Sequence, residues 1–467
     1  MPIPTLVTFA LYILAMVFIG AKFFKGTGEL SDYILGGRKL SSPVAALSAG
    51  ASDMSGWLLL GLPGALYAGG WVNIYMAVGL TIGAYLNWQF VAPRLRAQSQ
   101  AQGDALTIPD FFENHFADKS RLIRSSSAAI ILAFYGIYTA SGLVSGAILF
   151  EESFGLSYHM ALLIGAAVIV SYTFLGGFNA VSWTDFFQGL LMLFALIATP
   201  VFLLSHIDLR QIVTFSSDKT QATGWITVAS LLAWGLGYFG QPHILVRFMS
   251  LRDLKRMPVA RNIAMSWMVL SLCGAICTGL FGRIYFADAP LEQPEKVFIA
   301  LTQILFNPWM AGLLLAAILA AVMSTVDSQL LVCASALTED IYRAFLHKNA
   351  SQKELIWLSR AAVIAVACLA LVLAWNPKNR VLDLVAYAWA GFGAAFGPLM
   401  LFSLLDKRTT RAAALAGILS GAATVFIWRP LKGGIFDLYE LAPAFIISSL
   451  IIFTFSRIQN KLRQNRS

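Results

Sequence analysis

The chain has 467 residues, of which 58% are hydrophobic and only 12% are charged, and its mean hydropathy is +0.72. This composition excludes an ordinary soluble domain, in which about 25% of residues are charged. The net charge of +9 is best explained by cytoplasmic loops that lie beside anionic lipid, so we predict no nucleic acid partner.

Apolar runs of about 20 residues, the length that crosses roughly 30 Å of hydrocarbon, recur along the whole chain. They predict an all-α integral membrane protein with about thirteen transmembrane helices. The ninth run is too long for one crossing and is expected to project beyond the membrane surface. In chain order the predicted spans are 3–23, 43–67, 71–92, 122–150, 158–174, 187–204, 223–249, 263–286, 309–341, 355–375, 382–405, 412–428 and 441–455.

Basic residues gather after the odd-numbered spans. Arg38 and Lys39 follow the first span, Arg94 and Arg96 the third, and Arg247 lies in the basic group assigned to the loop after the seventh. Lys and Arg prefer cytoplasmic loops. This pattern therefore predicts an N-terminus outside the cell and a C-terminus in the cytoplasm.

The stretch 47–57 places a carboxylate, three hydroxyls and two glycines inside the second span, which predicts a broken helix. A carboxylate at the bilayer centre costs about 2.5–3.5 kcal/mol on insertion scales. Asp53 is therefore a candidate for an ion or substrate path, and it needs a partner.

A second break lies at 234–242 in the seventh span, where three glycines precede Pro242. Residues 235–240 fit the G-x-G-x-x-G dinucleotide fingerprint, but no strand precedes them and they lie at membrane depth, which excludes that interpretation. Either break alone is equally well explained as a kink without a ligand. Two breaks at matching positions instead favour a midplane binding site between inverted repeats.

The pairing of the breaks predicts a core of two inverted repeats of five helices, each of which opens with its discontinuous helix. The chain is expected to form a single transmembrane domain of residues 1–467. Within it we predict an extra N-terminal helix with a cytoplasmic loop (1–42), the first repeat (43–204), the second repeat (223–405), and two C-terminal helices with a basic tail (406–467).

A third polar group lies at 320–328 in the ninth span, where Ser324, Thr325 and Asp327 interrupt small apolar residues. Two hydroxyls beside the carbonyls of a broken helix are the oxygen ligands that a dehydrated Na⁺ requires. Alternatively, the hydroxyls bond back to the preceding helical turn. Asp327 either supplies negative charge for coupling or a second cation, or pairs with a polar group on a neighbouring helix.

The sequence resembles the sodium/solute symporter family, and within it the bacterial sodium/proline symporters, over nearly its whole length. The most specific matches are 47–63 and 235–243, and further matches are 31–38, 181–185, 323–325 and 387–393. This resemblance implies a core of ten helices in two inverted repeats, with one helix before the core and two after it. It also implies a multi-pass protein of the bacterial inner membrane.

The resemblance further implies which residues form the site. The Na⁺ ligands would be the carbonyls of Ala51, Met54 and Ala321 and the hydroxyls of Ser324 and Thr325, and Asp53 would take part in sodium coupling. Arg38 and Asp185 match positions tied to coupling or gating. The residues expected at the substrate are Ser55, Gly56, Trp57, Tyr138, Trp234, Tyr238 and Pro242.

The function implied is uptake of L-proline with Na⁺ by alternating access. No cofactor and no obligate protein partner are expected, and the surrounding membrane lipid is the remaining partner. One alternative is a symporter of the same family for another small carboxylate, such as pantothenate or another amino acid. A more distant alternative is a membrane sensor or a channel. The five scattered histidines form no H-E-x-x-H or Ser/His/Asp pattern, so we predict no enzymatic activity.

Overall fold

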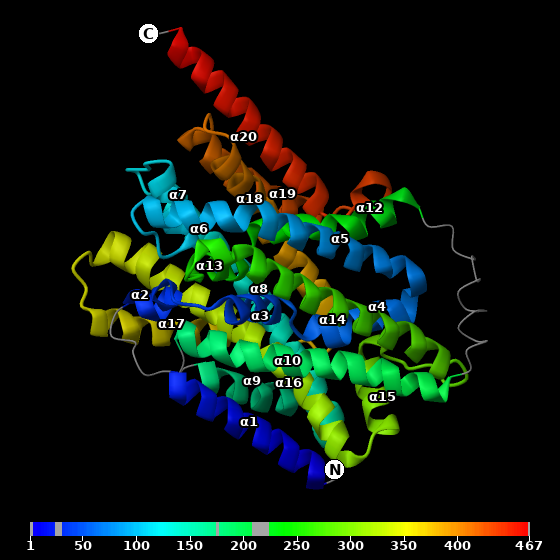
Figure 1. Cartoon of the computed structure of the whole chain (residues 1–467). Coiled ribbons are helices and arrows are strands. Elements are labelled where there is room, and N and C mark those ends of the chain that lie inside the picture. Colours follow the sequence, from blue (N-terminus) through cyan, green and yellow to red (C-terminus); the bar gives the residue numbers. More distant parts are fainter. Residues whose placement is uncertain (1–2, 24–29, 174–176, 208–223, 466–467) are drawn as a thin grey trace.

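The computed structural model describes residues 3–23, 30–173, 177–207 and 224–465 (Figure 1). Phe174 and Thr223, the predicted ends of two spans, lie outside the described residues. The described residues fold into helices, and their only β feature is an isolated parallel bridge between Leu40 and Leu251. The protein is therefore all-α, as predicted.

Within these residues, ten helical stretches are long and apolar enough to cross a membrane, and two shorter apolar helices join them at Tyr158–Val170 and Trp225–Gly240. One of the ten, Trp57–Ala101, is interrupted at Gly70, whose φ is +67°. It therefore consists of two helical segments, one before and one after Gly70. Length and composition thus give ten spans rather than thirteen. Each of the thirteen predicted spans nevertheless falls on helical structure.

The ninth predicted span runs on as one helical stretch, Pro308–Leu346, of 39 residues. Three short helices lie in the connections: α2 (Leu30–Leu35), α7 (Ile108–His115) and α15 (Val297–Leu305). In the order of the predicted spans, the helices are α1 (Ile3–Phe23); α3 (Ser42–Asp53), η2 (Trp57–Gly61) and α4 (Leu62–Gly69); α5 (Ile74–Leu86), η4 (Asn87–Val91) and α6 (Ala92–Ala101); α8 (Leu122–Phe154); α9 (Tyr158–Thr173); α10 (Phe178–Leu203); α12 (Trp225–Ala233), η6 (Trp234–Gly240) and α13 (Pro242–Ser250); α14 (Met257–Tyr285); α16 (Pro308–Ser335) and η9 (Ala336–Leu346); α17 (Gln352–Leu373); α18 (Val381–Leu405); α19 (Arg411–Trp428); and α20 (Leu441–Gln464).

Helices α8, α16 and α18 form the centre of the bundle. In their most apolar windows 72%, 83% and 83% of residues are buried, against 22% in α1 and 33% in α20. Figure 1 shows α1 along one edge of the bundle and α20 along the opposite edge, with α3, α8 and α16 between them. α1 and α20 therefore lie at the periphery of the described bundle.

Both predicted helix breaks are confirmed. α3 ends at Asp53, Met54 leaves the helical region with φ −84° and ψ +78°, and the chain becomes helical again at Gly56 and Trp57. In the second break, the narrow 3₁₀ helix η6 is followed by an extended Gln241, and α13 then begins with Pro242. Proline suits this first position because its missing N–H would have no helical partner there.

Glycines allow η6 to pack directly against the backbone of α5 and the side chains of α18. A Cβ atom placed on Gly83 would overlap the carbonyl oxygen of Gly235, and one on Gly237 would overlap the indole of Trp389. The glycines of the second break therefore permit close helix packing as well as the change of backbone direction.

We expect Gly237→Ala to destabilise the protein by about 1–3 kcal/mol, because the rigid indole of Trp389 has no room to retreat. The measurement is the thermal unfolding midpoint in detergent. Gly224→Ala is the matched control, since in the described part of the chain no atom beyond its immediate neighbours lies within 4 Å of the added methyl group. Equal unfolding midpoints for the two variants would contradict the claim that close packing against Trp389 requires a glycine at position 237.

Three arginines that the charge pattern placed in loops are buried. Arg38 is 9% exposed, Arg96 is 6% exposed and Arg247 is 1% exposed. The assignment of Arg247 to a cytoplasmic loop is wrong, because α13 continues through it to Ser250 and carries its side chain into the bundle. Charge spacing reports position in the sequence, and it does not distinguish a loop from the end of a half-helix.

Candidate functional site

The break after α3 frees a backbone carbonyl for other partners. In an unbroken helix the carbonyl of Ala51 would accept the N–H of Ser55. Here the N–H of Ser55 donates to the carbonyl of Asp53 instead, at 3.0 Å. The carbonyl of Ala51 therefore points out of the helix toward α16.

Four of the five predicted Na⁺ ligands meet at this carbonyl. The hydroxyl of Ser324 donates to the carbonyl oxygens of Ala51 (2.8 Å) and Ala321 (3.2 Å). The hydroxyl of Thr325 donates to the same carbonyl oxygen of Ala51 at 3.4 Å. All four residues are buried. Such a group of hydroxyl and carbonyl oxygens fits a hard cation. Met54, the fifth predicted ligand, is the buried first residue of the break, and its place in the ligand set stays a prediction.

Asp53 stands at the end of α3, where it joins both breaks. Its Oδ2 accepts a 2.5 Å hydrogen bond from the hydroxyl of Tyr238 on η6. Its backbone carbonyl accepts the indole N–H of Trp57 and the hydroxyl of Tyr138 on α8, each at 3.2 Å. Within the described part of the chain Oδ1 has no hydrogen-bond partner, although Asp53 is only 2% exposed. A buried carboxylate oxygen in this position calls for a cation or a donor from a ligand.

Three of the seven predicted substrate residues meet at Asp53, and two lie at the first break. Trp57, Tyr138 and Tyr238 all contact Asp53, as described above. Ser55 lies in the break, and Gly56 begins the half-helix that follows it. Gly56 packs so closely on Ser145 that a Cβ would overlap the hydroxyl of that serine.

Trp234 and Pro242 lie on either side of Tyr238 in the chain, but their side chains contact other groups. The ring of Trp234 stacks on Tyr439, with centroids 5.4 Å apart. Pro242 lines a small cavity beyond the break. Their part in substrate binding stays a prediction.

Sequence reasoning missed Trp389 on α18. Its indole N–H donates to the carbonyl of Trp234 at 2.8 Å, its ring meets Tyr238 edge-on at 5.1 Å, and its carbonyl accepts the side chain of Gln241. Trp389 therefore holds η6 in place along its length. The available signal was its position in the matched segment 387–393, which carried no role.

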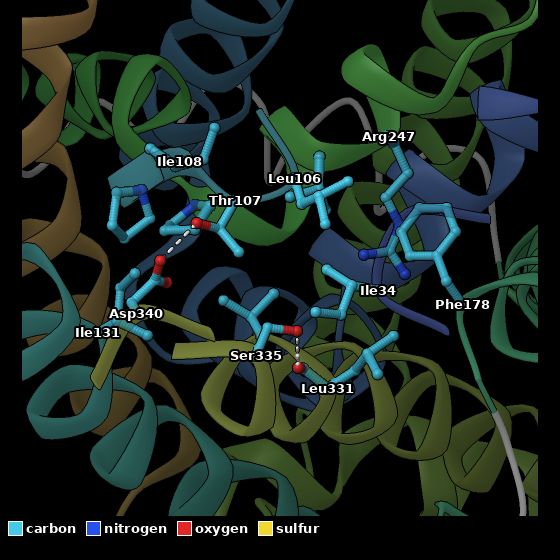
Figure 2. Close-up of a pocket in the computed structure, with 14 residues that line it drawn as sticks. Ile34, Leu106, Thr107, Ile108, Ile131, Phe178, Arg247, Leu331, Ser335 and Asp340 are labelled. Atoms are coloured by element: carbon cyan, nitrogen blue, oxygen red, sulfur yellow. Dashed lines mark hydrogen bonds between the residues drawn. The ribbon is translucent and has the colours of Figure 1, made fainter. Parts of the chain in front are cut away.

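The cavity beyond the second break is small, since the space open to the centre of a water molecule is about 20 Å³, room for one or two waters. Figure 2 shows Arg247 and Phe178 at one end of it and Thr107 with Asp340 at the other. The hydroxyl of Thr107 donates to Asp340 at 2.8 Å, and the same carboxylate binds Arg124 at 2.8 Å. The segment that contains Thr107 thereby lines this end of the cavity and is held to Asp340.

Arg38 lies away from the breaks and joins three segments. Its guanidinium donates to Asp104 and Ser99, to the carbonyl of Ala105, and to the carbonyl of Met249 at the end of α13, over 2.7–3.1 Å. Burial lowers the pKa of Arg38, and the nearby Asp104 opposes that shift. The predicted role of Arg38 in gating stays a prediction.

We expect Arg38→Lys to reduce the transport rate at least tenfold, because an ammonium group cannot reproduce the planar fork that reaches four acceptors. Initial rates in proteoliposomes at matched protein content measure the effect. Lys39→Arg is the control, since Lys39 is an exposed neighbour whose pair with Asp32 is 3.6 Å long. If Arg38→Lys transports as fast as Lys39→Arg, the geometry of the fork is unimportant.

The predicted coupling residue Asp185 is fully buried on α10. Its Oδ2 accepts the hydroxyl of Ser48 at 2.7 Å and pairs with the guanidinium of Arg247 at 3.2 Å. Asp327 is also fully buried, between Thr325 and Ser328 on α16, and its role stays a prediction. Asp185 on α10 thus contacts Ser48 of α3, the helix that also carries the Na⁺ ligand candidate Ala51.

A model of a known family, described as the sodium:solute symporter family, matches residues 33–421. The chain belongs to this family. Its coupling ion is Na⁺, in agreement with the cluster of oxygens at Ala51. The sodium/proline symporter of Escherichia coli (strain K12) is 53% identical over 467 residues, which cover 97% of this chain and 93% of that protein. In Bacillus subtilis (strain 168), the high-affinity proline transporter PutP is 49% identical over 449 residues, with 94% of each chain covered.

Two solved transporters show the fold of this symporter. A Na⁺-coupled sialic acid symporter in a substrate-bound outward-open state covers 98% of both chains with a TM-score of 0.83 and 18% identity. Mhp1, a transporter of the nucleobase-cation-symport-1 family in a closed conformation, covers 91% of this chain and 95% of its own, with a TM-score of 0.59 and 15% identity. The symporter therefore has the predicted fold class, an all-helical core with two discontinuous helices.

Proposed function

We propose that this symporter takes up L-proline together with Na⁺ across the inner membrane of a bacterium, with its N-terminus outside and its C-terminus in the cytoplasm. The observation that carries the proposal is the convergence of Ser324 and Thr325 on the freed carbonyl of Ala51, two residues before Asp53. The sodium/proline names of relatives at about half identity support the choice of solute. Surrounding lipid is the only further partner that the proposal requires.

In this proposal Na⁺ takes the place of the hydrogen bonds that now join α3 to α16. The hydroxyl hydrogens of Ser324 and Thr325 rotate away, and their oxygens join the carbonyls of Ala51, Ala321 and Met54 around the ion. Asp53 contributes its negative charge from two residues beyond Ala51. Binding of Na⁺ thereby fixes the first break against α16.

L-proline binds on the other side of Asp53, where aromatic side chains from three segments meet. The protonated secondary amine lies near Oδ1 of Asp53, which has no hydrogen-bond partner among the described residues. It also meets the faces of Trp57, Tyr138 and Tyr238. The carboxylate meets the positive end of the half-helix that begins at Gly56. Ser55, Trp234 and Pro242 complete the predicted pocket.

Transport then follows alternating access. Residues 43–204 and 223–405 act as the two repeats, residues 1–42 and 406–467 add the outer helices, and the solute is bound where the broken helices meet. The cavity below Pro242 lies on the route from that site to the cytoplasm, and the bond between Thr107 and Asp340 closes it. Opening of this bond releases Na⁺ and L-proline inward, and no chemical step is involved.

The second candidate is a symporter of the same family for another small carboxylate. The experiment is counterflow in proteoliposomes loaded with unlabelled L-proline, pantothenate or another amino acid, with labelled L-proline outside. We expect only internal L-proline to drive rapid entry of label. Exchange of labelled pantothenate with internal pantothenate, without exchange of L-proline, would overturn the substrate and leave the fold and the ion site intact.

A further inference from the structure

Arg247 is a cation inside the helix bundle, with a side chain that is 0% exposed. Its guanidinium lies 5.0 Å from the ring of Phe178, and Figure 2 shows the two side chains together at one end of the cavity. Its polar contacts are the carboxylate of Asp185 at 3.2 Å, the hydroxyls of Ser328 at 2.5 Å and Ser48 at 3.1 Å, and the carbonyl of His243 at 2.9 Å.

These contacts join four elements through one side chain. Ser48 belongs to α3, Asp185 to α10, Ser328 to α16, and Arg247 to α13. Both discontinuous helices therefore meet at this guanidinium, together with the helix that carries the candidate Na⁺ hydroxyls.

Two of the contacts lie one helical turn from the proposed ion ligands. Ser48 precedes Ala51 by three residues on α3, and Ser328 follows Ser324 by four residues on α16. The hydroxyl of Ser328 also donates to the carbonyl of Ser324 at 2.8 Å. A change in the distance between α3 and α16 at the ion therefore also changes the distance between the two hydroxyls that bind Arg247.

On its own helix, Arg247 follows the proposed substrate segment. It lies on α13, five residues after Pro242, whereas Tyr238 lies before Pro242 on η6. A guanidinium holds several acceptors in one plane, which a lysine ammonium cannot do. Loss of either charge of the Arg247–Asp185 pair leaves the other charge buried and uncompensated.

We propose that Arg247 is the positioning residue that couples the Na⁺ site to the substrate site. When Na⁺ draws α3 and α16 together, Ser48 and Ser328 are held at the distance that the guanidinium bridges. The bridge then fixes α13, and with it the substrate segment from Tyr238 to Pro242. This inference rests on the proposed function, and it assigns the coupling to a residue that touches neither ligand.

The test is equilibrium binding of labelled L-proline to the purified full-length protein, in K⁺ alone and in saturating Na⁺. Coupling between two ligands typically changes affinity by about 5- to 150-fold. We expect an enhancement in this range for the unmodified chain and an enhancement close to one for Arg247→Gln. Arg247→Lys, which keeps the charge without the fork, is expected to fall between them.

The double variant Asp185→Asn/Arg247→Gln separates coupling from folding, because it removes the buried pair without leaving a charge. We expect its thermal unfolding midpoint to return toward that of the unmodified chain, while Na⁺ still fails to raise the affinity for L-proline. Arg96→Gln is the control, since Arg96 is a second buried arginine that binds the carbonyl of Leu251 and is expected to keep the enhancement.

The outcomes distinguish the inference from the proposed function. If the double variant regains both stability and the Na⁺ enhancement, Arg247 has a structural role only and the inference is overturned. If Arg247→Gln keeps the full enhancement, the inference is overturned as well. If the unmodified chain itself binds no L-proline in Na⁺, the proposed function fails, and the inference falls with it.

Discussion

Asp53→Asn is expected to weaken Na⁺-dependent transport more than any other single change at the site. The substitution keeps the shape of the side chain but removes a buried charge, and loss of one partner from a buried charge pair costs about 2–5 kcal/mol, roughly 30- to 5,000-fold. The large effect is expected because Oδ1 has no hydrogen-bond partner in the described structure and is left for a cationic ligand. The measurement is the Na⁺ concentration that gives half-maximal uptake of labelled L-proline.

Tyr238→Phe is the matched comparison for this prediction. It removes the hydrogen bond to Oδ2 but keeps both the carboxylate and the aromatic ring. A hydrogen bond to a charged group is worth about 1.5–3 kcal/mol, so its effect is expected to be smaller than that of Asp53→Asn. A half-saturating Na⁺ concentration within threefold of the unmodified value in Asp53→Asn would remove Asp53 from the coupling mechanism.

Thr325→Ala is expected to have the second largest effect, and one that is confined to the ion. It removes one of the two hydroxyls proposed as Na⁺ ligands beside the carbonyl of Ala51. We expect the half-saturating Na⁺ concentration to rise by about 5- to 150-fold, in line with about 1–3 kcal/mol for a buried polar group that loses its partner. At saturating Na⁺ the KM for L-proline should stay nearly unchanged.

Two substitutions test the specificity of this effect. Thr325→Ser keeps the hydroxyl and should restore most of the Na⁺ affinity. Ser335→Ala also removes a buried hydroxyl from α16, one that donates to the carbonyl of Leu331. This substitution should leave Na⁺ affinity unchanged. Equal shifts in Thr325→Ala and Ser335→Ala would indicate a general effect on α16 and would contradict the assigned ligand.

The membrane spans and both breaks could be predicted because bilayer thickness and backbone chemistry act locally. A run of apolar residues must be helical to satisfy its own N–H and C=O groups in lipid. Asp53 among small hydroxyl residues, and glycines before Pro242, disturb that rule visibly in the sequence. Pairing of the two disturbed spans then pointed to the region where Asp53 meets Tyr238, 185 residues away in the chain.

The contacts that organise the site could not be predicted, because they depend on which helix faces which. Trp389 and Tyr439 look like ordinary aromatic residues of an apolar chain, yet they hold Trp234 from two sides. Arg247 follows an apolar run like a loop residue, yet α13 turns it inward to Asp185. Whether a polar residue at the end of a half-helix is buried depends on the neighbouring helices, and a single sequence does not give their orientation.

Two proline transporters of Bacillus subtilis (strain 168) are similar to this chain over nearly its whole length. Besides the high-affinity transporter PutP at 49% identity, Bacillus subtilis (strain 168) has an osmoregulated proline transporter, OpuE, at 47% identity over 464 residues. The two identities are nearly equal. Both names describe transport of proline.

Accumulation of labelled L-proline in proteoliposomes, driven by an imposed inward Na⁺ gradient and a negative internal potential, tests the central claim most directly. With about 100 mV worth roughly 2.3 kcal/mol per charge and a tenfold Na⁺ gradient worth about 1.4 kcal/mol, one Na⁺ sustains accumulation of up to roughly 500-fold. We predict accumulation well above equilibrium with Na⁺, none when K⁺ replaces it, and strong impairment in Asp53→Asn. Equal uptake in Na⁺ and K⁺, or entry that stops at equilibrium, would contradict Na⁺-coupled symport of L-proline by this chain.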